Sequence, residues 1–395
     1  MTYIAPDHYS YDYKLDIEKL PAQQRDRVPG KVLWPGLFFG GMFLLLGIFE
    51  VLSYFFHDDH EDYTFTLPEK FSLSDMVVQR YIFDAFVLLF GILIITLVMM
   101  AMKRCKDIFF DGENIRIEHR PLCGEPKVVT EKLHNYLGVL FRVEYYQFGL
   151  INRNRYIIEL YHRDANKKVP LYISTSGKNI RKIWEYYAAK FKLPALFMSD
   201  RGLVSRSYSN LDVSLRDMAQ KWKLNTISFK DLNVPSSIRF VVKSNRAILK
   251  ERRLFFDAYT VLAFLGLVVL GFLALYAGLN YHIIIPYIGS RVFWVMMAFW
   301  AAVFILSAVV LFSKDVLVLS PDGILLGHNT LFMRRDIEFI PRDEVEEIDI
   351  GYNPTTERYY LSISSKERHI VYGKNMPMED LRWIRGLVIR DVIKN

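Results

Sequence analysis

Cysteine is scarce in this chain, whose 395 residues include only Cys105 and Cys123. Two thiols are too few for the disulfide framework that stabilises small secreted domains. The first 31 residues are polar and aromatic, and no apolar stretch begins before Val32. We therefore expect no cleaved signal peptide.

Motifs of the common catalytic classes are also missing. The sequence has no phosphate-binding loop, no G-x-S-x-G elbow, no H-E-x-x-H motif, no C-x-x-C pair and no kinase motif set. We therefore expect a protein that is not an enzyme and needs no cofactor.

Long apolar runs are abundant, in contrast. Hydrophobic residues make up 52% of the chain, while charged residues still make up 24%. Four runs stand out, at 32–56, 82–102, 255–279 and 292–312. Each is close to the roughly 20 residues that cross a bilayer as a helix. The runs are therefore predicted to form two transmembrane hairpins.

Positive charge gathers beside these runs and gives the chain a net charge of +7. The positive-inside rule then places both termini in the cytoplasm of a multi-pass protein of the bacterial inner (plasma) membrane. We expect the flanking cations to contact anionic lipids of the inner leaflet, each contributing about 1 kcal/mol, and expect no nucleic-acid partner. These cations are Lys103, Arg104, Lys106, Arg246, Lys250, Arg252 and Arg253.

A β-rich region follows each hairpin, at 108–192 and at 316–393. Segments of alternating or β-branched residues predict strands in both. Each region closes on a helical pattern, the first running from Ile180 to Phe191 with Trp184 on its apolar side, and the second following Pro377. KDIFFDGENIRI matches KDVLVLSPDGILL, and RYIIELYHRDANKKVPLYI matches RYYLSISSKERHIVY. The pattern therefore predicts an internal repeat.

These features divide the chain into six predicted parts. They are a cytoplasmic arm (1–31), a first transmembrane hairpin (32–102), a first β domain (103–195), a connector with an amphipathic helix (196–253), a second hairpin (254–313) and a second β domain (314–395).

Several residues of the second copy form a recognisable set: 317–325 (LVLSPDGIL), the Ile340-Pro341 step leading into Val345, Ile348 and Ile350, and the helix after Met376. With them the duplicated unit resembles the bacterial membrane-anchored pleckstrin-homology-like (bPH) domain family. The first copy lacks the Ile-Pro step and has an insertion near 146–153. The resemblance implies two transmembrane helices before a small β-barrel closed by a helix. It also implies binding or assembly roles, with no catalytic residues to transfer.

The HDDHED run at 57–62 combines two imidazoles with four carboxylates. His57, Asp58 and His60 would suit zinc or another divalent ion. The alternative is a solvated acidic outer loop. A second acidic group, at 343–349, is predicted to be a solvated face, with a partner's basic surface as the alternative.

Glu50 lies inside the first apolar run. A carboxylate within a bilayer costs about 2.5 kcal/mol or more, so we expect it to pair with Arg291 or Arg80. Such a pair would anchor the hairpins or serve an ion or proton step, unless Glu50 extends to the headgroup water. Gly36 and Gly40, four residues apart, predict a close helix–helix approach.

The sequence thus predicts an α+β membrane protein with four transmembrane helices in two hairpins, each followed by a small cytoplasmic β-rich PH-like domain closed by a helix. The expected function is that of a non-catalytic inner-membrane scaffold or accessory subunit that binds a protein partner or forms a homo-oligomer at the cytoplasmic face. The alternatives are a small transporter or channel subunit, and a lipid-modifying membrane enzyme.

Overall fold

The structure is a computed structural model. It describes residues 8–56, 76–121, 124–148, 151–207, 234–243, 246–251, 314–329, 334–353, 357–374 and 376–393, with isolated positions between 268 and 305. The chain forms two compact units, which we describe separately. The N-terminal unit comprises residues 8–11 and 16–131, and the C-terminal unit comprises residues 1–7, 12–15 and 132–395.

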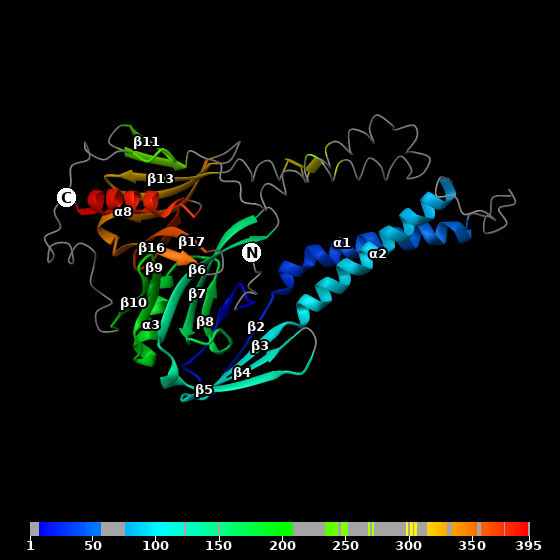
Figure 1. Ribbon diagram of the computed structural model, residues 1–395, viewed down its shortest axis with the longest axis horizontal. Coiled ribbons are helices and arrows are strands. Elements are labelled where there is room, and N and C mark those ends of the chain that lie inside the picture. Colours follow the sequence, from blue (N-terminus) through cyan, green and yellow to red (C-terminus); the bar gives the residue numbers. More distant parts are fainter. Residues whose placement is uncertain are drawn as a thin grey trace. The chain divides into compact units, whose positions relative to one another are not determined.

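The N-terminal unit combines two helices, α1 (Gly30–Phe56) and α2 (Met76–Lys103), with a four-stranded sheet (Figure 1). The sheet order is β2 (Ala22–Arg27), β3 (Cys105–Phe110), β4 (Asn114–Arg120) and β5 (Lys127–Lys132). Strands β2, β3 and β4 pair antiparallel. Alternation buries Ile108, Phe110, Ile115 and Ile117 on one face and leaves polar residues on the other.

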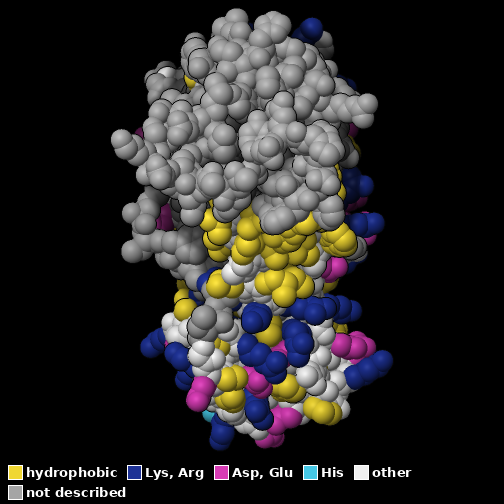
Figure 2. Space-filling view, turned by 90° about the vertical axis from the view of Figure 1, so that its right-hand side faces the viewer, with side chains coloured by type: hydrophobic (Ala, Val, Ile, Leu, Met, Phe, Trp, Pro, Cys, Tyr) yellow, Lys and Arg dark blue, Asp and Glu magenta, His cyan; other side chains and the backbone are white. Residues whose placement is uncertain are grey.

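Glycines let α1 and α2 pack closely against each other. A Cβ added to Gly36 would lie 2.7 Å from Cγ2 of Val98, and one added to Gly91 would lie 2.6 Å from the backbone nitrogen of Leu44. The rings of Phe43 and Phe90 meet edge to face at 5.3 Å. The close approach predicted at Gly36 is therefore confirmed. Apolar side chains gather on the face of the molecule shown in Figure 2.

The membrane prediction is contradicted. No helix among the described residues combines the length and the apolar character needed to cross a membrane. Within the described residues this finding contradicts the fold class with four transmembrane helices and the multi-pass location in the inner membrane. Apolar composition was the signal behind them. In α1 and α2 glycines and some apolar side chains pack one helix on the other, whereas large apolar side chains such as Phe49 and Leu89 are exposed. The described elements are mostly β-strands instead, and the runs at 255–279 and 292–312 lie outside the described residues except at isolated positions.

Two sheets organise the C-terminal unit (Figure 1). The larger has the order β1 (Tyr13–Lys14), β8 (Val169–Ser174), β7 (Ile151–Tyr161), β6 (Gly138–Phe148), β9 (Ala195–Ser199), β16 (Glu347–Asn353), β17 (Arg358–Ser364) and β18 (His369–Tyr372), with β10 (Gly202–Arg206) paired to β9. The smaller has the order β11 (Ile238–Lys243), β12 (Arg246–Glu251), β13 (Lys314–Ser320), β14 (Gly323–Asn329) and β15 (Arg334–Pro341).

The two predicted amphipathic helices are present as α3 (Ile180–Phe191) and α8 (Met378–Ile393). Trp184 of α3 is 3% exposed, as predicted, and its indole nitrogen donates to the carbonyl of Val139 at 2.8 Å. Helix α8 begins directly after Pro377 and buries Leu381, Ile384, Leu387, Val388 and Val392. These side chains close one apolar core with residues of both sheets, such as Leu317 and Leu361.

One order of elements occurs twice along the chain. Strands β3 to β5, a 3₁₀ turn (Leu133–Asn135), strands β6 to β8 and α3 match strands β13 to β15, a 3₁₀ turn (Arg342–Glu344), strands β16 to β18 and α8. The first set is divided between the two compact units. The six predicted parts and the pleckstrin-like resemblance stay predictions.

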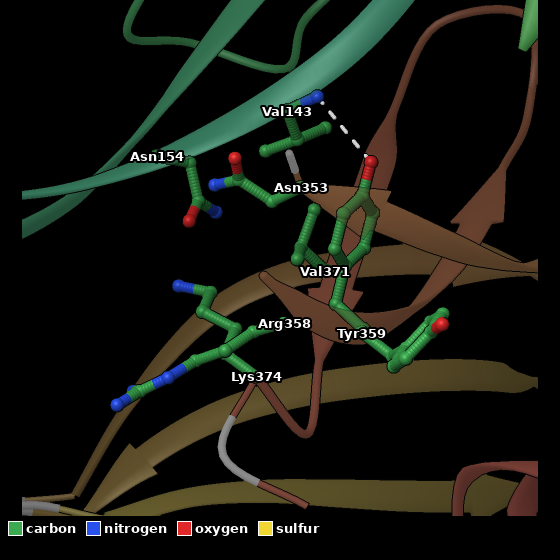
Figure 3. A pocket seen from close by; sticks show the side chains of 8 residues that line it. Val143, Asn154, Asn353, Arg358, Tyr359, Val371 and Lys374 are labelled. Atoms are coloured by element: carbon green, nitrogen blue, oxygen red, sulfur yellow. Dashed lines mark hydrogen bonds between the residues drawn. The ribbon is translucent and has the colours of Figure 1, made fainter. Parts of the chain in front are cut away.

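The two sets meet inside the larger sheet, at a junction that we call the seam. Strand β9 pairs in parallel with β6, and its Ser199 pairs with Gly351 of β16. The backbone N–H of Val143 on β6 donates to the hydroxyl of Tyr360 on β17 at 3.3 Å (Figure 3). The seam therefore belongs to one folded unit.

Ion pairs also cross the seam. Arg181 of α3 lies 2.8 Å from Glu346 and 3.1 Å from Glu347, and Arg382 of α8 lies 3.2 Å from Asp200. Glu346 and Glu347 are buried. The predicted solvated face at 343–349 is therefore wrong at these two positions, because arginines of the same chain cover them.

The N-terminal arm and the connector contain more structure than their composition indicates. The arm supplies β1 to the larger sheet and β2 to the sheet of the N-terminal unit. The connector supplies β9 to β12. Its predicted amphipathic helix lies outside the described residues.

Candidate functional site

An array of arginines covers the polar face of the N-terminal sheet. We define the arginine face as Arg25 and Arg27 of β2 with Arg116 and Arg120 of β4. Strand register places them together, since Arg25 is paired with Asp107, Arg27 and Arg120 both with Cys105, and Arg116 with Phe109. All four therefore point to the side opposite the buried Ile108 and Ile117.

Two carboxylates hold three of these guanidinium groups, those of Arg25, Arg116 and Arg120, in place. Nε of Arg25 lies 2.5 Å from Oδ1 of Asp107, and Nη2 of Arg120 lies 3.2 Å from Oδ2 of the same carboxylate. Glu118 lies 3.1 Å from Arg120, and the guanidinium of Arg116 lies 5.9 Å from the ring centroid of Phe109. Four arginines against Asp107 and Glu118 leave an excess of two positive charges.

The guanidinium groups are fixed and still accessible. The side chains of Arg25, Arg116 and Arg120 are 48%, 56% and 47% exposed, whereas that of Asp107 is 3% exposed. Figure 2 shows Lys and Arg side chains gathered beside the apolar side chains of this face of the molecule. Since a guanidinium is charged at every physiological pH, the positive charge of this surface is permanent.

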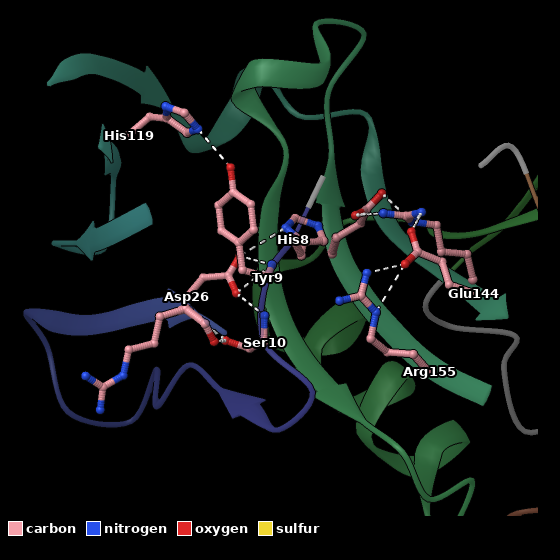
Figure 4. Close-up of polar contacts among 10 residues, drawn as sticks. His8, Tyr9, Ser10, Asp26, His119, Glu144 and Arg155 are labelled. Carbon is pink, nitrogen blue, oxygen red and sulfur yellow. Dashed lines mark hydrogen bonds and ion pairs between the residues drawn. The ribbon is translucent and has the colours of Figure 1, made fainter. Parts of the chain in front are cut away.

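A polar cluster fastens the start of the chain to the opposite side of the same sheet (Figure 4). The buried carboxylate of Asp26 accepts from the backbone N–H of Tyr9 at 3.0 Å and from that of Ser10 at 2.6 Å. The hydroxyl of Tyr9 lies 3.1 Å from Nε2 of His119, and burial lowers the pKa of His119. These contacts fix β2, and with it Arg25 and Arg27.

A second buried polar group belongs to the C-terminal unit (Figure 4). Arg142 of β6 pairs with Glu144 of the same strand and with Glu159 of β7, and Glu144 pairs in turn with Arg155 of β7. Arg142 is 1% exposed and Glu159 is fully buried. Every charge in this chain of pairs has an opposite neighbour, so a shift in the register of the hairpin β6–β7 would leave buried charges unpaired.

The predicted lipid-facing cations have different environments. Lys103, in the last turn of α2, and Arg246 of β12 are exposed, whereas Arg104 and Lys250 are half-buried. Lys106 is buried on β3 with its Nζ 5.9 Å from the ring centroid of Tyr9. Arg252 and Arg253 lie outside the described residues. Of the five cations that the structure describes, only Lys103 and Arg246 are therefore exposed.

The other predicted site residues are untested. His57, Asp58, His60 and Arg291 lie outside the described residues. Glu50 lies in α1 and Arg80 in α2, but their side chains are not described, so the proposed pairing stays a prediction. Within the described ranges, no group of three His, Cys, Asp or Glu residues is arranged to hold a metal ion.

Sequence reasoning missed the arginine face because it treated residues 1–31 as an arm. The sequence did contain a signal for strands with arginines on one face, since Arg25 and Arg27 are two residues apart and Arg116 lies between Ile115 and Ile117. Comparison of the chain with models of protein families, with curated proteins and with solved structures gives no match.

Proposed function

We propose that this protein is a non-catalytic scaffold or accessory protein that binds an acidic segment of a protein partner through its arginine face. The observation that carries the proposal is the set of half-exposed guanidinium groups held in register by Asp107 and Glu118. Groups fixed before binding lose little conformational entropy when a carboxylate arrives. Arginine also binds carboxylates with two parallel hydrogen bonds.

The spacing of the arginines suits an extended acidic segment. Arg25 and Arg27 are two residues apart on one strand, a separation of about 7 Å. Alternate carboxylates of an extended peptide have the same separation, so one face of such a segment would meet both arginines. We infer that complementary charge sets the choice of partner and the rate of encounter.

Fluorescence anisotropy with a labelled poly-glutamate peptide tests the proposal on the full chain. We expect binding that weakens with salt, and a loss of about tenfold in affinity in the double variant Arg25→Gln, Arg120→Gln, equivalent to about 1.4 kcal/mol. Lys190→Gln, which removes an exposed cation of the C-terminal unit, should bind like the unchanged protein.

Three outcomes would contradict the proposal. If the double variant bound the peptide with unchanged affinity, the arginine face would not be the binding surface. Preferential binding of an oligonucleotide of matched charge would point to a nucleic-acid partner. Light scattering that shows an oligomer dispersed by the double variant, without peptide binding, would make a second copy the occupant.

A further inference from the structure

The hairpin β11–β12 lies at one end of the smaller sheet and carries four cations (Figure 1). Strand register pairs Arg239 directly with Lys250, and Lys243 directly with Arg246. Residues that are directly opposite on antiparallel strands lie on the same face of the sheet, as do alternate residues of one strand. All four positive charges therefore share one face of the hairpin, and we call them the hairpin cations.

This face points away from the apolar core of the C-terminal unit. Phe240 and Leu249, which alternate with the hairpin cations along the two strands, belong to the core or pack against it. Three of the hairpin cations are exposed, and the fourth, Lys250, is half-buried. A binding partner can therefore reach them.

The chain supplies no negative charge to balance these cations. Within the described residues, none of their side chains takes part in an ion pair or a hydrogen bond. On the arginine face, in contrast, Asp107 and Glu118 neutralise part of the positive charge. Like charges directly opposite each other destabilise a pair of strands. An anionic partner would remove this repulsion, so the hairpin is complementary to negative charge.

Strand β11 also offers hydrogen-bonding groups along its outer edge. It is the last strand of the five-stranded order, and within the described residues that edge pairs with no other strand. An edge strand presents a row of unpaired backbone N–H and C=O groups, to which an extended segment can add as a further strand. Because cations on an edge discourage pairing between copies of one chain, a segment that adds here must carry negative charge.

An apolar position separates the two cations of β11. Val241 lies between them on the same face and is 38% exposed. A strand added to β11 would place alternate side chains opposite Arg239, Val241 and Lys243. The two cations are four residues apart, which is roughly 14 Å along a strand. A complementary segment therefore has the order acidic, any, apolar, any, acidic.

We propose that β11 binds an extended acidic segment of a partner protein, which adds to the smaller sheet as a further strand with carboxylates opposite Arg239 and Lys243. Backbone hydrogen bonds supply affinity in this mode of recognition, and alternate side chains supply specificity. A nucleic acid would use the cations but neither the strand edge nor Val241. The hairpin belongs to the C-terminal unit and the arginine face to the N-terminal unit, so the inference does not rest on the proposed function.

Fluorescence anisotropy of the full chain with the labelled peptide Thr-Glu-Thr-Val-Thr-Glu-Thr tests the proposal. We expect saturable binding that weakens at least about tenfold in Lys243→Glu. This variant places a carboxylate opposite Arg246, so it relieves a repulsion within the hairpin and should not lower the melting temperature. Lys190→Glu makes the same change in charge at an exposed position of α3 and should bind the peptide like the unchanged protein.

Two further peptides separate strand addition from the attraction of charge alone. The peptide Thr-Thr-Glu-Glu-Val-Thr-Thr has the same composition but adjacent carboxylates, and it should bind more weakly. The first peptide with N-methyl groups on the amides of one edge should also bind more weakly, because it has lost the donors that pair with β11. A peptide with lysines in place of both glutamates should prefer the double variant Arg239→Glu, Lys243→Glu to the unchanged protein.

Circular dichroism confirms that each variant is folded before its affinity is compared. The proposal fails if the unchanged protein does not bind the first peptide, if folded Lys243→Glu binds it with unaltered affinity, or if N-methylation has no effect. Loss of binding in Arg25→Gln, Arg120→Gln but not in Lys243→Glu would assign the peptide to the arginine face. Tighter binding of an oligonucleotide of matched charge, or of vesicles that contain phosphatidylglycerol, would make a nucleic acid or a lipid surface the occupant instead.

Discussion

The hairpins β6–β7 and β16–β17 have matching strand register, but they differ in the charges that they bury. Arg142, Glu144, Arg155 and Glu159 form a buried chain of ion pairs in the first. The equivalent residues of the second are Gly351, Asn353, Arg358 and Ser362. Three of four charges are thus absent, and a Cβ on Gly351 would lie 2.3 Å from the Tyr360 ring, which fills the space. One backbone arrangement therefore accepts either an ion-pair chain or an aromatic ring over glycine.

The largest expected effect comes from breaking the ion-pair chain. Arg142→Met leaves the buried carboxylates of Glu144 and Glu159 short of a cation, which should lower the free energy of unfolding by roughly 3–5 kcal/mol. Arg358→Met at the half-buried arginine of the second hairpin should cost less than about 1 kcal/mol. Urea denaturation of both variants measures the difference, and equal losses would contradict the comparison.

The pH dependence of stability gives a second test of the comparison, through His369. This residue of β18 contacts the rings of Phe141 and Tyr156 from the first hairpin. Burial, with a smaller effect from Arg181, lowers its pKa to about 3. The unfolded chain binds this proton below about pH 6.5 and the folded chain does not, so the stability due to His369 is lost as pH falls from 6.5 toward 3.

The variant His369→Phe tests this prediction, because its side chain cannot bind a proton. Between pH 6.5 and pH 4, the unchanged protein should lose about 3 kcal/mol more of its free energy of unfolding than this variant does. Parallel pH profiles from chemical denaturation would show that His369 is charged in the folded state.

A last test of the comparison concerns Asp349, whose equivalent in the first hairpin is Leu140. Burial and the neighbouring Glu347 raise the pKa of Asp349 to about 7, against the opposing charges of Arg385 and Arg206. The folded state therefore holds this proton more tightly, and the stability it provides is lost as pH rises from about 4 through 7. Asp349→Asn should be more stable than the unchanged protein at pH 8, by up to about 4 kcal/mol if the whole shift belongs to Asp349, with no difference at pH 3.5. Thermal melts at both values measure this, and a destabilised variant at pH 8 would show that the ion pair with Arg385 dominates.

Local patterns in the sequence were sufficient to predict features that depend only on residues of the same helix or strand. The apolar sides of α3 and α8 were predicted because helical spacing alone places Ile180 beside Trp184 in α3 and Leu381 beside Ile384 in α8. Partners distant in the chain were not predicted. Glu346 and Glu347 resemble a solvated acidic face until Arg181, more than a hundred residues earlier, covers them. Likewise, Arg25 belongs to a site only because β2 pairs with β3, across the whole of α1 and α2.

The seam has a consequence for how the C-terminal unit responds to ionic strength. Its strand ladder narrows to the single pairing of Ser199 with Gly351 between β9 and β16, so side chains supply much of the connection. Some of these pairs, such as Lys182 with Glu367, are about half exposed, whereas Arg181 is buried. Salt screens exposed pairs far more than buried ones. Raising the salt concentration would therefore weaken the exposed ion pairs of the seam first and leave its buried contacts, those of Arg181 and His369, in place.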